Sequence, residues 1–305
     1  MYTGFAEVYD TLMNDVHYGA WADMYARMMT AYGIPRNAKV CECACGTGSL
    51  TLPLQQLGYE MMGIDLSQEM LWQAAQKARK AGFGIPFIRQ DMRQLRLHRP
   101  VDAVLATCDG VNYLLQDVDA AAFFQSAWDA IKPGGGLFFD VSTPYKLEHL
   151  LGSQFMGEDR RDVTYMWQNR YFPERQQVEM HLAIFVKEPD GRYRRIDEEQ
   201  VQRAYQAEKL VALLQSIGFV DVRVFGTNAL THPAPEEHRW HIAARKPEEG
   251  LKHTPASEWQ GESPPQRRNP CINTRTQYAI ARNSIARKGV QRVEDPLAES
   301  RGRAS

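Results

Sequence analysis

The 305-residue sequence lacks any apolar run of roughly 18 residues, the length that a helix needs to cross a bilayer. Its opening residues, Met1-Tyr2-Thr3-Gly4-Phe5-Ala6-Glu7, also lack the basic-then-apolar pattern of a secretory signal. The five cysteines are an odd number, and the crowding of three of them at positions 41, 43 and 45 is not typical of a disulfide framework. We therefore expect a cytoplasmic protein with reduced thiols and no membrane association.

A strong charge of one sign is also absent, but the charge is unevenly distributed. Residues 1–249 contain 26 Lys and Arg against 32 Asp and Glu, a net charge of −6, whereas residues 250–305 contain 10 against 5, a net charge of +5. An acidic body argues against binding to a phosphate backbone. Residues 249–305 have few large apolar side chains and several prolines, so we predict that they form a disordered basic tail.

Short apolar strands alternate with helices along residues 39–245, after a helical region at 5–32. Helices are predicted at 49–57, 67–81, 119–131 and 208–217. Seven strands are predicted, at 39–43, 60–64, 86–89, 102–107, 137–141, 220–225 and 238–245. This alternation indicates an α/β fold, a parallel sheet with helices on both faces. In such a sheet, ligands bind beyond the carboxyl ends of the strands.

Between about 160 and 205 the pattern changes to three extended segments, at 163–171, 177–186 and 193–204. The last two are joined by the turn sequence Pro189-Asp190-Gly191. We interpret this region as a small antiparallel β insertion that lies over the site as a lid. It falls within a single domain covering residues 1–248.

The strand at 39–43 runs directly into a glycine-containing bend, Val40-Cys41-Glu42-Cys43-Ala44-Cys45-Gly46-Thr47-Gly48-Ser49-Leu50. Glycine lets the backbone approach a ligand closely, and the helix that follows offers unpaired N–H groups. A dinucleotide site would need a third glycine where this sequence has Ser49 or Thr51. The pattern instead suits a ligand with an amino-acid end, whose ammonium meets Glu42 and whose carboxylate meets the amides of the bend.

Polar residues follow the next three predicted strands as well. Asp65 ends the second strand, about 20 residues beyond the bend, where an acidic residue can hold a ribose diol. Gln90-Asp91-Met92 follows the third strand, and Thr107-Cys108-Asp109-Gly110-Val111-Asn112-Tyr113 follows the fourth.

Together these motifs resemble motif I and its companions in the class I S-adenosylmethionine-dependent methyltransferases, with Ala44 where glycine is commoner. The resemblance implies S-adenosyl-L-methionine as the cofactor and a Rossmann-like, seven-stranded methyltransferase sheet. It also implies that Asp91 faces the adenine amino group, that Met92 packs on the ring and that Cys108 lies near the transferable methyl. The expected cofactor-binding residues are Tyr9, Glu42, Ala44, Cys45, Gly46, Gly48, Asp65, Leu66, Asp91, Met92 and Cys108.

Over about residues 1–247 the chain is similar to the bacterial YqeM-like methyltransferases and, more distantly, to N-methyltransferases of nucleotide-linked aminosugars. In those relatives the N-terminal helix closes over the cofactor, which makes Tyr9 an expected contact. The shared segments are Gly4-Phe5-Ala6-x-x-Tyr9-Asp10, Cys108-Asp109-x-x-Asn112-Tyr113-Leu114, Asp140-Val141-Ser142-Thr143-Pro144-Tyr145 and Arg203-Ala204-Tyr205.

A sulfonium methyl group is already activated, so alignment of the acceptor supplies much of the catalysis, and a general base is needed only for a protonated acceptor. The candidates for that base, none of them singled out, are Tyr9, Tyr18, Asp109, Tyr113 and His149. The loop at 108–113 is not the Asp/Asn-Pro-Pro-Tyr type that acts on nucleic-acid amino groups. A small-molecule acceptor, methylated on N or O, is therefore favoured.

Several side chains allow a functional and a simpler interpretation. Arg160-Arg161 and Arg194-Arg195 on the insertion would suit an anionic substrate such as a nucleotide-sugar, or they form an ordinary solvated face. Cys41, Cys43 and Cys45 lack a histidine or a fourth ligand at standard spacing, so no metal site is expected.

Three alternative functions stay open. The first is an RNA methyltransferase, although the acidic body of the chain argues against a nucleic-acid partner. The second is a non-catalytic regulator that binds the cofactor on the same fold. A dinucleotide-dependent oxidoreductase fits less well because the third glycine is missing. The chain is also compatible with either a monomer or a homodimer.

Overall fold

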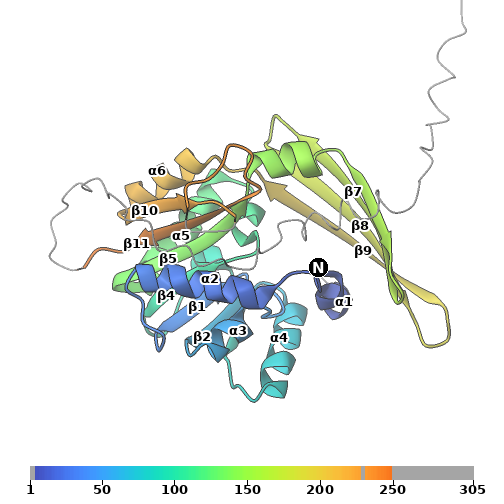
Figure 1. Ribbon diagram of the computed structural model, residues 1–305, viewed down its shortest axis with the longest axis horizontal. Helices are drawn as coiled ribbons and strands as arrows, with labels where there is room; N and C mark the ends of the chain where they lie inside the picture. Colours follow the sequence, from blue (N-terminus) through green and yellow to red (C-terminus); the bar gives the residue numbers. More distant parts are fainter. Residues whose placement is uncertain (1–3, 228–230, 249–305) are drawn as a thin grey trace, which may run out of the picture.

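The structure is a computed structural model that describes residues 4–227 and 231–248, so the predicted tail at 249–305 lies outside the described residues. Two sheets stand side by side, with the N-terminal helix α1 (Phe5–Leu12) between them (Figure 1). In the described part of the chain, no helix combines the length and apolar character needed to cross a membrane.

The larger sheet confirms the predicted fold class. Its seven strands lie in the order β10-β11-β5-β4-β1-β2-β3, in which β1 to β5 are parallel and β11 runs antiparallel to both of its neighbours. The carboxyl ends of the parallel strands therefore share one edge of the sheet. The strands are β1 (Lys39–Cys43), β2 (Glu60–Asp65), β3 (Phe87–Arg89), β4 (Val101–Ala106), β5 (Ile131–Ser142), β10 (Val220–Phe225) and β11 (Arg239–Arg245).

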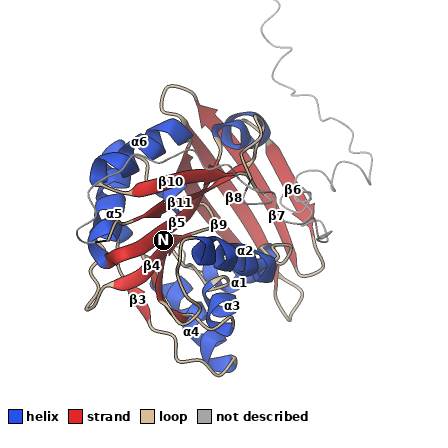
Figure 2. Cartoon of the chain, turned by 60° about the vertical axis from the view of Figure 1, so that its left-hand side comes forward, coloured by secondary structure: helices blue, strands red, loops and turns tan. Residues whose placement is uncertain are grey.

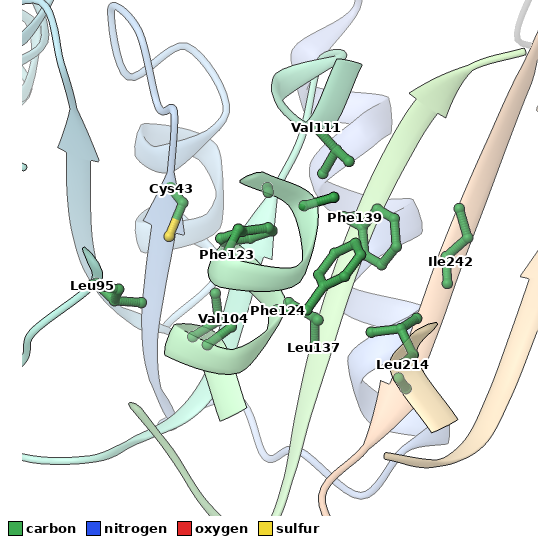
Figure 3. Close-up of a cluster of buried hydrophobic side chains, with 14 of the residues drawn as sticks. Cys43, Leu95, Val104, Val111, Phe123, Phe124, Leu137, Phe139, Leu214 and Ile242 are labelled. Carbon is green, nitrogen blue, oxygen red and sulfur yellow. The ribbon is translucent and has the colours of Figure 1, made fainter. Parts of the chain in front are cut away.

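Helices cover both faces of this sheet, because its central strands are apolar on both sides (Figure 2). Successive residues of a strand face opposite ways, so Phe139 packs with α5 and α6 while Phe138 packs with α2. Figure 3 shows the first of these two cores, in which Phe123 and Phe124 of α5 lie against the sheet. The helices are α2 (Tyr18–Ala31), α3 (Thr51–Gln56), α4 (Gln68–Lys80), α5 (Asp117–Ala130) and α6 (Ala207–Ile217).

The second sheet is the antiparallel insertion, with four strands rather than the three predicted. The strand missed from the sequence is β6, an edge strand whose residues are all exposed or half-buried, so no alternation marks it. Buried residues on one face of the sheet, among them Val163 and Ile184, pack against α1. The strands are β6 (Phe155–Asp159), β7 (Val163–Phe172), β8 (Gln177–Lys187) and β9 (Tyr193–Arg203).

The helical region predicted at 5–32 is two helices, not one. Helix α1 ends at Leu12, and α2 begins at Tyr18. The guanidinium of Arg160 donates hydrogen bonds to the backbone oxygens of Thr11 and Leu12, at 3.0 and 3.3 Å. These bonds satisfy carbonyl groups that a helix end leaves unpaired, so a distant residue fixes the break.

Two of the other boundaries that differ from the prediction have a plain physical cause. Helix α3 begins at Thr51 rather than at residue 49, because the glycine bend extends through Gly48 before the chain turns helical. Strand β5 begins at Ile131, so the Pro-Gly-Gly-Gly segment lies within it. A Cβ on Gly135 would lie only 2.5 Å from the backbone oxygen of Asp102, so glycine here permits close approach of β5 to β4.

Gly63 on β2 provides a test of this packing. A Cβ at this position would lie 2.6 Å from Cδ1 of Phe87 and 2.7 Å from Sγ of Cys45. We expect Gly63→Ala to lower the free energy of unfolding by about 1–3 kcal/mol, as overpacking does, measured by urea denaturation. Gly84→Ala is the matched control, because a Cβ there meets nothing within 4 Å. Equal stabilities of the two variants would contradict this account.

Candidate functional site

A cavity of about 370 Å³ opens at the carboxyl ends of β1, β2 and β4, under helix α1. We call it the cofactor cavity, after the role that the sequence predicts for its residues. Of the eleven residues expected from the sequence to bind the cofactor, ten line it: Tyr9, Glu42, Ala44, Cys45, Gly46, Asp65, Leu66, Asp91, Met92 and Cys108.

Gly48, the eleventh, is not among the lining residues. Its φ is +70°, in the left-handed region, and a Cβ there would lie 3.1 Å from Cβ of Ala74 on α4. Gly48 therefore allows the bend to turn and to pack against α4, and it does not contact the cavity itself.

The bend itself is stabilised by backbone hydrogen bonds. The amide of Cys45 donates to the backbone oxygen of Ile64 at 3.0 Å, and the amide of Gly48 donates to that of Cys45 at 2.9 Å. Ala44 adopts a φ of +52°, a left-handed conformation that alanine rarely takes. Gly110 faces it, where an added Cβ would lie 3.1 Å from Cβ of Ala44, so the glycine at 110 makes room for the side chain at 44.

Glu42 is a buried carboxylate in the cavity wall, 2% exposed. It accepts hydrogen bonds from the hydroxyls of Thr51 and Thr107, at 2.5 and 2.9 Å. Burial raises its pKa from 4.5 to about 7, with the threonine hydrogen bonds opposing the shift. Since the folded pKa exceeds the unfolded one, stability falls as pH rises from 4.5 to about 7, by about 3 kcal/mol in total. Ionisation of Glu42 thus lowers the stability of the fold. Such a cost is typical of a charged side chain that serves to bind a ligand.

Asp65 joins the bend to the second strand. Its carboxylate accepts hydrogen bonds from the amides of Gly46 and Ser67, at 2.8 and 2.9 Å. Burial raises its pKa, and these amides oppose the shift. The hydrogen bonds fix the carboxylate at the cavity wall while leaving lone pairs for a ligand hydroxyl.

Asp91 lies in the cavity wall, and its carboxylate pairs with Arg93, a residue to which the sequence assigned no role. Arg93 donates from its backbone amide and its guanidinium to the Asp91 carboxylate, at 2.7–3.1 Å, and also pairs with Asp119 at 2.8 Å. The hydrogen bonds to Arg93 lower the pKa of Asp91. Asp91 is thereby held ionised at the wall that also contains Met92.

The loop after β4 has unusual backbone geometry. Cys108 and Asp109 both adopt left-handed conformations, with φ of +55° and +67°. Their amides donate to the Asp140 carboxylate at 2.7 and 3.1 Å, and Asp140 is fully buried on β5. Arg239 of β11, 1% exposed, pairs with Asp140 and also with Asp109, at 2.6 Å. These hydrogen bonds and ion pairs hold the loop in its strained backbone conformation and so fix Cys108 at the cavity.

A second cluster ties α1 to the bend. The carboxylate of Asp10 accepts hydrogen bonds from the hydroxyls of Thr47 and Ser49, at 2.7 and 3.0 Å, and pairs with Lys77 at 2.7 Å. Sequence reasoning assigned no role to these residues. The only signal was the place of Asp10 in the N-terminal motif, because the fold alone brings Lys77 of α4 into contact with residue 10.

A second cavity, of about 180 Å³, lies between α1, the loop after β4 and the inner face of the antiparallel sheet. We call it the acceptor cavity, after the role that we propose for it. Six residues line both cavities and so mark their boundary: Phe5, Tyr9, Tyr18, Cys108, Tyr113 and Gln200. At this boundary the hydroxyl of Tyr113 donates a hydrogen bond to Oε1 of Gln200 at 2.8 Å.

The five candidates for a base are therefore distributed unequally. Tyr9, Tyr18 and Tyr113 lie at the boundary, and Asp109 lines the acceptor cavity. His149 lines neither cavity; its ring lies 5.5 Å from that of Tyr145, centroid to centroid. The pKa of Asp109 is raised by burial but lowered further by Arg239 and Lys146, so it falls below its usual range. Asp109 is consequently a poor proton acceptor.

A parallel sheet with an antiparallel last strand, a glycine bend after β1 and acidic residues at the ends of β1 and β2 define an S-adenosylmethionine-dependent methyltransferase. The family model described as "Methyltransferase domain" matches residues 40–135. The chain belongs to the YqeM-like methyltransferases: it is 32% identical over 247 residues to the putative methyltransferase YqeM of Bacillus subtilis, covering 81% of this chain and 97% of YqeM.

Solved structures agree with this assignment. An S-adenosylmethionine-dependent methyltransferase from Clostridium acetobutylicum is 28% identical with a TM-score of 0.71, covering 81% of this chain and 99% of that chain. An amino pentose methyltransferase from Micromonospora echinaspora, solved with S-adenosylmethionine bound, has a TM-score of 0.63 at 20% identity, covering 78% and 96%. The second likeness shows a shared fold alone.

The Asp140 network leads to a test of stability. Asp140→Asn removes the charge that pairs with buried Arg239, and breaking such a pair typically costs about 3–5 kcal/mol. We expect a loss of this size in the free energy of unfolding, measured by urea denaturation. Asp197→Asn, which breaks an exposed pair with Arg195, is the control and should change stability by less than about 1 kcal/mol. Similar losses in both variants would refute the structural role of Asp140.

Proposed function

We propose that this methyltransferase transfers the methyl group of S-adenosyl-L-methionine, held in the cofactor cavity, to a nitrogen or oxygen of a small molecule in the acceptor cavity. The observation that supports this proposal is the common boundary of the two cavities, formed by six shared residues. A methyl donor on one side and a nucleophile on the other would meet only there.

The residues of the cofactor cavity fit the parts of the cofactor. Glu42 would meet the ammonium of the methionine end, directly or through water, and the amides of the bend would meet its carboxylate. Asp65 would hold the ribose diol, and Asp91 and Met92 would lie at the adenine. Each of these side chains already lines the cavity, and Glu42, Asp65 and Asp91 are fixed by hydrogen bonds from neighbouring groups.

The boundary offers alignment rather than a strong base. When bound, the sulfonium supplies an activated methyl group. Burial raises the pKa of the Cys108 thiol to about 12 and raises the pKa values of Tyr9 and Tyr18 above their usual range. None of these three groups accepts a proton readily near neutral pH. The acceptor would therefore react as a neutral amine or a pre-ionised hydroxyl, oriented by polar groups such as the amide of Gln200.

Two substitutions in the cofactor cavity test the binding model. Asp65→Ala removes the carboxylate assigned to the ribose, and Gly46→Arg places a long side chain in the bend at the cavity wall. We expect each to weaken S-adenosylhomocysteine binding at least tenfold by isothermal titration calorimetry. Asp197→Ala, on the exposed face of β9, is the control and should bind normally. If both cavity variants keep the wild-type affinity, the proposed site is wrong.

The pKa of Glu42 predicts a pH dependence. Only the ionised carboxylate attracts an ammonium, and with a pKa of about 7 the ionised fraction rises roughly fifteenfold between pH 5.5 and 7. We therefore expect the affinity for S-adenosylhomocysteine to rise by about that factor over this range, measured by calorimetry. Glu42→Gln should bind more weakly at pH 7 and lose the dependence. An unchanged pH profile in Glu42→Gln would show that another group titrates.

A further inference from the structure

We infer that the acceptor is a compact, mainly apolar ring compound that carries its nucleophilic amine or hydroxyl directly and has no phosphate. This inference rests on the proposed function and narrows its substrate class. It concerns the acceptor cavity alone, so it is tested separately from the cofactor site.

The walls of the acceptor cavity are the first observation. Apolar side chains come from α1 and the following loop and from the inner face of the antiparallel sheet, where Leu182 and Met180 of β8 lie beside Trp167 of β7. Three methionines contribute, and methionine adapts its shape to an apolar ligand. The apolar and aromatic lining residues that belong to this cavity alone are Leu12, Met13, Val16, Leu151, Met156, Tyr165, Trp167, Met180 and Leu182.

Size is the second observation. The cavity volume of about 180 Å³ compares with the ~150 Å³ engineered cavity that holds benzene. Such a space therefore suits a compact ring compound. A nucleoside diphosphate sugar is much larger, so most of it would lie outside.

The balance of charge is the third observation. The cationic residues lining the acceptor cavity are Lys146 and Arg239. Arg239 is paired with Asp109 and Asp140, and the ammonium of Lys146 lies 3.9 Å from Asp109 and donates a hydrogen bond to Ser142 at 2.8 Å. Two cations therefore face two carboxylates, and no net positive charge is left for a diphosphate.

The four arginines that the sequence suggested for an anionic substrate, Arg160, Arg161, Arg194 and Arg195, do not supply that charge. Arg160 pairs with Glu158 at 2.9 Å and caps α1. Arg194 pairs with Glu7 and Glu188, at 3.1 and 2.9 Å, and Arg195 pairs with Asp197. These three arginines and Arg161 are absent from the lining of both cavities. The simpler interpretation, a solvated face, therefore suits the exposed Arg161, Arg194 and Arg195 better than a nucleotide-sugar site does, and Arg160 has a structural role at the end of α1.

The experiment measures binding to the full chain saturated with S-adenosylhomocysteine. The probes are 2-naphthol, as a compact apolar hydroxyl compound, and thymidine diphosphate glucose, as a nucleotide-sugar. We expect the first to bind and the second to show no binding at millimolar concentration by calorimetry. Binding of thymidine diphosphate glucose, or failure of 2-naphthol to bind, would overturn the inference.

A pair of neighbouring substitutions locates the probe. Leu182→Trp fills the acceptor cavity, whereas His181→Trp lies on the opposite, exposed face of the same strand. We expect Leu182→Trp to weaken 2-naphthol binding at least tenfold, and His181→Trp to leave it within twofold. S-adenosylhomocysteine affinity should be the same in both, because neither residue lines the cofactor cavity. Failure of the wild-type chain to bind S-adenosylhomocysteine would instead contradict the proposed function.

A second variant with a smaller side chain keeps the test valid if Leu182→Trp does not fold. Leu182→Ala enlarges the cavity without overpacking it, and circular dichroism checks that each variant is folded. We expect Leu182→Ala to bind the bulkier 4-phenylphenol at least threefold more tightly than the wild type does. If both Leu182 variants bind 2-naphthol and 4-phenylphenol with the wild-type affinity, the two probes bind elsewhere and the inference is refuted.

Discussion

The site depends on one buried interaction, the carboxylate of Asp140 holding two consecutive backbone amides while it pairs with Arg239. The loop that it holds contains two non-glycine residues in left-handed conformations, which cost free energy unless the surroundings impose them. Asp140 and Arg239 lie on the adjacent strands β5 and β11. The antiparallel end of the sheet is thus what sets the position of the loop between the two cavities.

Glu42 illustrates a different constraint, in which binding and stability are opposed. A buried carboxylate with a pKa near 7 weakens the fold when it ionises, yet the proposed role requires the ionised form. The hydroxyls of Thr51 and Thr107 moderate this cost without neutralising the charge. Such a compromise is expected where a charge serves a ligand rather than the core.

The sequence predicted the features that depend on local pattern, and it failed where distant residues decide. Periodicity and glycine positions located the seven strands, and the family resemblance together with the motifs gave eleven expected residues, ten of which lie in one cavity wall. The break after α1 was missed because Arg160, far along the chain, stabilises it. The pairing of Asp91 with Arg93, and the grouping of Asp10 with Lys77, likewise depend on side-chain geometry that no periodicity encodes.

Helix α1 is bonded on one side to the bend through Asp10 and packed on the other against Val163 and Ile184 of the antiparallel sheet. Neither sheet would cover this helix alone: without residues 155–203, the apolar side chains of Phe5, Val8 and Leu12 would face water. The antiparallel sheet therefore covers apolar side chains of a helix that is hydrogen-bonded to the larger sheet's glycine bend. Because α1 links the two sheets, the packing of the antiparallel sheet and the position of the glycine bend are coupled through this helix.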